Sequence, residues 1–156
     1  MRRRAWDTTL YDLAEGQAGY FTAAQARRAG VHQVRLVQLQ KRGDIERATR
    51  GVYRLTRFPV SAHGQYMEAV LWPQVRRPDA QGVISHESAL AIYGLSDASP
   101  AKVHVTLPTA FRVRRAVPTH VALHYADVEP GDVQRVEGLP VTTPSRAIRD
   151  AHAAHL

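Results

Sequence analysis

Residues 20–55 read YFTAAQARRAGVHQVRLVQLQKRGDIERATRGVYRL. Thr22 and Gln25 have the spacing of a capping box, which predicts a short helix from this point to about residue 29. Gly30 can supply the positive φ of a tight turn, and a further helix is expected from residue 32 or 33 to Gly43. Two short helices joined by such a turn are typical of a helix-turn-helix.

A β-hairpin is predicted directly after these helices. Ile45 begins one short β-run and Val52 to Leu55 form the other, with the glycine of the connecting Arg47–Gly51 stretch at the hairpin tip. The hairpin would be the wing of a winged helix-turn-helix. We expect Tyr53 to fill the core between wing and helix rather than to stack on a base.

The same part of the chain carries all of the net charge. Residues 1–60 contain twelve Lys and Arg against five acids, which gives +7, whereas the nine basic and nine acidic residues of 61–156 cancel. A basic patch confined to one module is what phosphate binding requires, because each neutralised phosphate releases condensed counterions. The alternative is an arginine-rich but merely solvated surface.

The second helix of the pair is expected to be the recognition helix, because Arg, Lys and Gln side chains read base edges or hold phosphates. Val34 and Val37 leave open which of its sides faces the bases. The arginines of the hairpin would contact the DNA backbone or the minor groove. The predicted DNA-binding residues are Arg27, Arg28, Gln33, Arg35, Gln38, Lys41, Arg42, Arg47, Thr49, Arg50 and Arg54.

The flanking sequence predicts an α+β fold of two domains, with a linker near residues 58–61 where proline and the change of charge coincide. Residues 1–60 would form the winged helix-turn-helix, opened by a helix with Trp6 and Leu10 on its apolar stripe. Residues 61–156 would form a small α+β domain with a mostly antiparallel sheet. Helices are predicted at 63–72, at 85–95 with Ser85 as N-cap, and from 143 to the end, and strands at 103–107, 121–125, 133–136 and 139–142.

Composition excludes several classes of site. The chain has no cysteine, so it can form neither a disulfide nor a thiolate metal site. The basic start is followed by acids rather than by the apolar segment of a signal peptide, and no apolar run approaches the roughly 20 residues that span a bilayer. We therefore expect a cytoplasmic protein that binds no membrane and no cofactor.

The sequence offers only weak candidates for a catalytic or metal-binding site. His86 and Glu87 could act as acid and base, but in the first turn of a helix their structural use is favoured. Two pairs of histidines, His120 with His124 and His152 with His155, share a face of a predicted element but lack further ligands for a metal. A basic cluster, at Arg112, Arg114 and Arg115, could extend a DNA footprint or lie in a solvated loop. We therefore predict that the protein is not an enzyme.

The order of these motifs resembles the AbiEi-type antitoxins of type IV (AbiE) abortive-infection toxin–antitoxin systems. Four segments carry the resemblance: the helix and turn of residues 22–31, the run KRGDIER leading to RGVYR at 41–54, SHESAL with the following GL at 85–95, and GLPVTTPSR at 138–146.

The resemblance implies a transcriptional regulator that binds inverted repeats in its own promoter, acts as autorepressor, and opposes a nucleotidyltransferase-like toxin, with phage defence as its setting. We expect a monomer or weak homodimer on double-stranded DNA. An alternative is the DNA-binding front of a nuclease-like enzyme whose catalytic domain lies beyond Leu156, and a third is a winged helix that contacts only the toxin.

Overall fold

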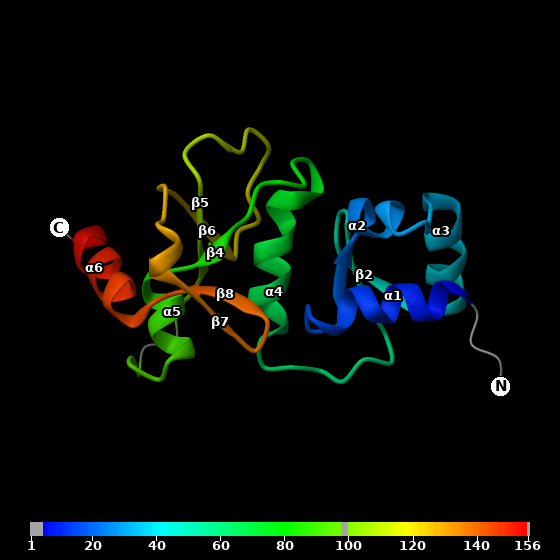
Figure 1. Cartoon of the computed structure of the whole chain (residues 1–156), viewed down its shortest axis with the longest axis horizontal. Helices are drawn as coiled ribbons and strands as arrows, with labels where there is room; N and C mark the ends of the chain where they lie inside the picture. The colour runs from blue at the N-terminus through cyan, green and yellow to red at the C-terminus, as the bar shows by residue number, and fades with distance from the viewer. Residues whose placement is uncertain (1–4, 98–99, 156) are drawn as a thin grey trace. The chain divides into compact units, whose positions relative to one another are not determined.

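The computed structural model describes residues 5–97 and 100–155, with side chains from residue 8 onward (Figure 1). The chain divides into two compact units, Met1–Pro78 and Asp79–Leu156. The expected place of Trp6 on an apolar stripe lies outside the described side chains. No helix of the described part is long and apolar enough to cross a membrane.

In the residues that the structure describes, the first unit has five helical segments and a three-stranded antiparallel sheet of order β1-β3-β2. In chain order its elements are α1 (Ala5–Glu15), β1 (Tyr20–Thr22), α2 (Ala23–Arg28), α3 (Gln33–Arg42), β2 (Ile45–Thr49), β3 (Val52–Leu55), α4 (Gly64–Leu71) and the 3-10 helix η1 (Trp72–Val75). The hairpin β2–β3 is the predicted wing. Strand β1 was not predicted, since three residues are too few to display an alternating pattern.

The helix boundaries follow the local signals of the sequence. The Thr22 hydroxyl accepts from the Gln25 amide at 3.0 Å while the Gln25 side chain accepts from the Thr22 amide at 2.9 Å, so the predicted capping box is present. Gly30 has φ +94° in the inter-helix turn and Gly43 has φ +81° at the end of α3. The helix-turn-helix is therefore confirmed.

A single apolar core holds the helices against the sheet. Phe21 of β1 and Tyr53 of β3 are paired across the strands, and their rings stack with centroids 5.8 Å apart. Both side chains are buried, together with Leu10 of α1 and with Leu36 and Leu39 of α3. Tyr53 is thus a core residue, as predicted.

The first unit extends further than the predicted boundary at residue 60. Helix α4 packs against β1, where Gly64 lies against the ring of Tyr20, and η1 brings Val75 onto the hairpin tip. A Cβ at Gly51 would stand 2.4 Å from Val75, so this glycine is required both by its φ of +82° and by close packing. Residues 61–78 therefore complete the first unit instead of starting the second.

The second unit is an α+β structure in which a five-stranded sheet has the order β6-β5-β4-β8-β7. Its elements are β4 (Val83–Ile84), α5 (His86–Ile92), β5 (Val103–Leu107), β6 (Val121–Tyr125), the 3-10 helix η2 (Pro130–Asp132), β7 (Val133–Val136), β8 (Leu139–Thr142) and α6 (Pro144–Ala154). Helices α5 and α6 pack side by side (Figure 1).

The expected mostly antiparallel sheet is in fact mixed. β4 pairs antiparallel with β5, and β7 with β8, but β4–β8 and β5–β6 are parallel. β5 and β6 are parallel because the long connection between them returns the chain to the same end of the sheet before β6 begins. The other parallel pairing joins the two-residue strand β4 to β8, which is distant from it in sequence. Strand β4 is too short to be recognised from its pattern.

Candidate nucleic-acid interface

The orientation of α3 resolves which of its sides faces outward. Leu36 and Leu39 are almost fully buried, whereas the eight other residues of the helix are exposed. With 3.6 residues per turn, the side opposite the two leucines carries Val34, Val37, Gln38 and Lys41. We call these four residues the outer stripe of α3.

Exposed cations surround this helix. Most of the predicted DNA-binding residues are exposed, and Thr49 is half-buried; the exposed ones are Arg27, Arg28, Gln33, Arg35, Gln38, Lys41, Arg42, Arg47 and Arg50. They lie at the end of α2, along α3 and on the wing, so the first unit brings together cations from three successive elements. On α3, Arg35 donates to Gln38 Oε1 at 3.2 Å, and Arg42 Nε lies 3.5 Å from an Asp44 carboxylate oxygen.

Arg54 departs from the prediction that it edges the wing as a DNA contact. Its side chain is buried, and its guanidinium donates to the Phe58 carbonyl and pairs with Glu46 at 3.3 Å. Because β3 is the central strand of the sheet, a long side chain there is covered by neighbouring segments. Arg54 therefore ties the wing to the segment that follows it.

A second cluster, which the sequence reasoning missed, lies in the second unit. The imidazole rings of His86, His104 and His124 form a stack in which the His86 and His124 centroids are 3.7 Å apart. A hydrogen bond of 2.9 Å joins His104 Nδ1 to His124 Nε2. His104 had no signal of its own in the sequence, since only the parallel register of β5 and β6 brings it to His124.

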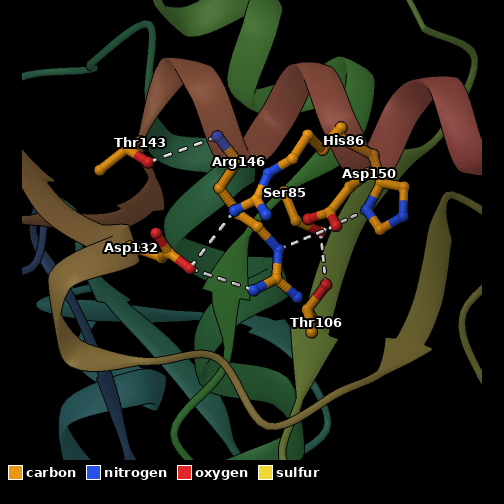
Figure 2. Close-up of polar contacts among 8 residues, drawn as sticks. Ser85, His86, Thr106, Asp132, Thr143, Arg146 and Asp150 are labelled. Atoms are coloured by element: carbon orange, nitrogen blue, oxygen red, sulfur yellow. Dashed lines mark hydrogen bonds and ion pairs between the residues drawn. The ribbon is translucent and has the colours of Figure 1, made fainter.

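The start of α5 explains how His86 joins this stack. His86 has φ +55°, a left-handed conformation that is uncommon for a residue with a side chain. Ser85 stands at the N-cap position, but its hydroxyl makes no capping hydrogen bond, contrary to the prediction. Instead, Ser85 Oγ lies 2.7 Å from Thr106 Oγ1 and 2.8 Å from His86 Nδ1, as Figure 2 shows.

Burial lowers the pKa of all three stacked histidines, and for His124 the pKa falls to about 4, with the neighbouring imidazoles lowering it further. The stack is therefore uncharged near pH 7. Within residues 5–97 and 100–155, no three His, Cys, Asp or Glu side chains are grouped so that they could hold a metal ion.

Beside the stack, Arg146 links α6 to the 3-10 helix η2 (Figure 2). Its guanidinium donates to Asp150 at 2.9 Å and to Asp132 at 3.2 Å, and the hydrogen bond that Asp150 accepts raises the pKa of Arg146. Thr143 caps the helix, which begins where it was predicted, by accepting from the Arg146 amide at 3.4 Å. Glu87 pairs with His155 across α5 and α6. These contacts account for Glu87 and Arg146 as structural groups.

The geometry of the first unit defines a class. Winged helix-turn-helix DNA-binding regulators combine a helix-turn-helix with a hairpin wing and with exposed cations near the recognition helix. The first unit has these features, with α3 as the helix that the cations flank. The family model described as transcriptional regulator, AbiEi antitoxin, matches residues 9–56. The match covers less than half of the chain, agrees with the resemblance drawn from the sequence and supports a DNA-binding regulator.

Among solved structures, that of the RV2827C protein from Mycobacterium tuberculosis is similar, with 18% sequence identity and a TM-score of 0.49. The likeness covers 84% of this chain and 48% of that one, so this chain spans about half the length of that protein. No curated protein matches the chain.

Proposed function

We propose that this protein is the antitoxin and autorepressor of a type IV, AbiE-like toxin–antitoxin system, acting in the cytoplasm without catalytic activity of its own. In this proposal the first unit binds inverted repeats in the protein's own promoter. The cognate partner is a nucleotidyltransferase-like toxin, and phage defence is the setting.

The observation that carries the proposal is the presentation of α3. Two buried leucines anchor the helix, and the rest of its surface is exposed and edged by the arginines of α2 and the wing. A helix held in this way can enter a major groove while flanking cations contact phosphates. The family match over residues 9–56 supports the same use of this module.

The test is a binding titration of the full chain on the intergenic DNA upstream of its gene and on a shuffled duplex of equal length and composition, at several salt concentrations. We expect tighter binding to the upstream DNA and a logarithm of affinity that falls linearly with the logarithm of salt concentration. A reporter under this promoter should be repressed by the chain in cells. Equal binding to both duplexes, or no repression, would contradict autorepression.

A toxin partner is tested separately. We expect a nucleotidyltransferase-like gene beside this one, whose product inhibits growth when expressed alone and loses that effect when the chain is co-expressed. Continued growth inhibition at high antitoxin expression would exclude the antitoxin role while leaving DNA binding intact.

A further inference from the structure

The outer stripe of α3 contains two exposed valines that the fold does not need. Val34 is 73% exposed and Val37 is 40% exposed, whereas the core contact of the helix is made by Leu36 and Leu39. Exposed β-branched residues lower helix propensity slightly and add nothing to the core. Their place on the outward side of the helix leaves both side chains available to a ligand.

The surroundings of these valines indicate nucleic acid as the ligand. Exposed cations stand on the same helix, with Arg35 next to Val34, and with Lys41 and Arg42 about one turn or slightly more beyond Val37. Two valine side chains are far too small a patch to hold a protein partner, for which about 800 Å² on each side is typical. A pair of apolar groups flanked by positive charge instead matches the major groove, where thymine methyl groups lie between two rows of phosphates.

The neighbouring Gln38 can add a polar contact that also favours an A·T pair. A glutamine can pair with the N6 and N7 edge of adenine through its amide. Arg35 donates to Gln38 Oε1, which holds the amide in one orientation. The Nε2 group can then donate to adenine N7, while the second lone pair of Oε1 accepts from N6.

We propose that Val34 and Val37 determine base specificity by contacting thymine 5-methyl groups, so that each half-site of the operator carries neighbouring A·T pairs under α3. This inference rests on the proposed function. Residues three apart on a helix are separated by about 4.5 Å along its axis, which is close to the roughly 3.4 Å spacing of stacked base pairs. The two valines can therefore reach adjacent pairs, with Gln38 on an adenine of the same step.

The experiment uses the full chain and an operator mapped by footprinting on the upstream DNA. Each thymine of the footprint is replaced singly by deoxyuridine, which removes only the 5-methyl group. Dissociation constants are measured for the wild type, Val34→Ala and Val37→Ala. Val60→Ala is the matched control, because Val60 is 89% exposed and lies outside the helices and the wing.

We expect one or two thymine positions at which deoxyuridine weakens wild-type binding by about fourfold, the loss that one buried methyl predicts. At those positions Val34→Ala or Val37→Ala should bind the thymine duplex and the deoxyuridine duplex with equal affinity. Val60→Ala should retain the difference in affinity that the wild type shows. If an alanine variant unfolds, Val34→Gln and Val37→Gln give the same comparison, because glutamine carries no methyl group and has a higher helix propensity than valine.

If the wild type binds its operator specifically but no thymine shows this coupling, the inference is overturned and the proposed function stands. If the wild type shows no specific binding to the upstream DNA, both the inference and the proposed function are overturned. A Val34→Ala variant that weakens every duplex to the same extent also overturns the inference, since it would mean a general contact instead of a methyl contact.

Discussion

At the scale of single residues, the arginines of the wing divide into two kinds. Arg47 and Arg50 are exposed, whereas Arg54 is buried and bonded to Phe58 and Glu46. All three appear equivalent in sequence, because alternation in a short hairpin does not reveal which neighbours cover the central strand. Their different environments predict different consequences of removal.

Replacing Arg50 by Ala should weaken DNA binding on all sequences and reduce the slope of log affinity against log salt by about one, since one phosphate contact is lost. The measurement is a salt titration by fluorescence anisotropy. Arg135→Ala, which removes an exposed arginine from β7 of the second unit, is the control and should leave the slope unchanged. A wild-type slope for Arg50→Ala would exclude Arg50 as a phosphate contact.

Replacing Arg54 by Ala should instead lower the free energy of unfolding, by about 1–3 kcal/mol, because the partly buried Phe58 carbonyl loses its donor. The salt slope of DNA binding by the folded variant should stay at the wild-type value. Urea unfolding gives the stability, with Arg57→Ala as control because Arg57 is an exposed arginine three residues away. A flattened salt slope in Arg54→Ala would return this residue to the DNA interface.

At the scale of elements, the helix ends that depend on residues close in sequence were predicted correctly, whereas a cap that depends on a distant strand was not. The capping box at Thr22 and the left-handed glycines at 30 and 43 depend on neighbours within a few residues, and these helix ends agree with the structure. Ser85 has the same cap-like sequence, yet its hydroxyl bonds Thr106 of another strand. A hydroxyl at an N-cap position bonds the helix only when no tertiary partner competes for it.

Replacing Thr22 by Ala should cost about 1 kcal/mol of stability, because one end of α2 loses its capping hydrogen bond. Thr22→Ser keeps the hydroxyl and should recover most of this loss. Urea unfolding followed by the circular dichroism of the full chain provides the comparison. An equal loss in both variants would show that packing of the buried Thr22 methyl group, and not capping, accounts for the effect.

At the scale of the whole molecule, two units with separate cores divide the tasks. The excess of positive charge lies in the first unit, and the neutral histidine stack lies in the second. The excess of Lys and Arg in residues 1–60 predicted this placement of the charge. The stack was not predictable, because His86, His104 and His124 come from three elements whose contacts depend on the parallel register of β5 with β6.

The histidine stack predicts acid sensitivity of the second unit. Its histidines titrate below the ordinary value of 6.5, and His124 near 4, so at pH values between these the unfolded chain binds more protons than the folded one. Stability should therefore fall as the pH is lowered from about 6.5 toward 4. Asp150 and Glu87 oppose this effect, while Arg146 and Lys102 reinforce it.

The measurement is amide hydrogen exchange in β5 and β6 at pH 7 and pH 5, corrected for the intrinsic exchange rate. His124→Asn should reduce the loss of protection at pH 5, and His152→Asn, on an exposed position of α6, should not. Equal protection at both pH values in the wild type would contradict the prediction.

The sequence by itself determined the helix-turn-helix, the wing and the location of the charge, because caps, turn glycines and net charge are local or additive properties. Only the tertiary structure decided that Arg54 is buried, that residues 61–78 belong to the first unit, that Val34 and Val37 face outward, and that three histidines stack. These features depend on which distant segments cover a side chain, and such contacts are set by the packing of the whole unit.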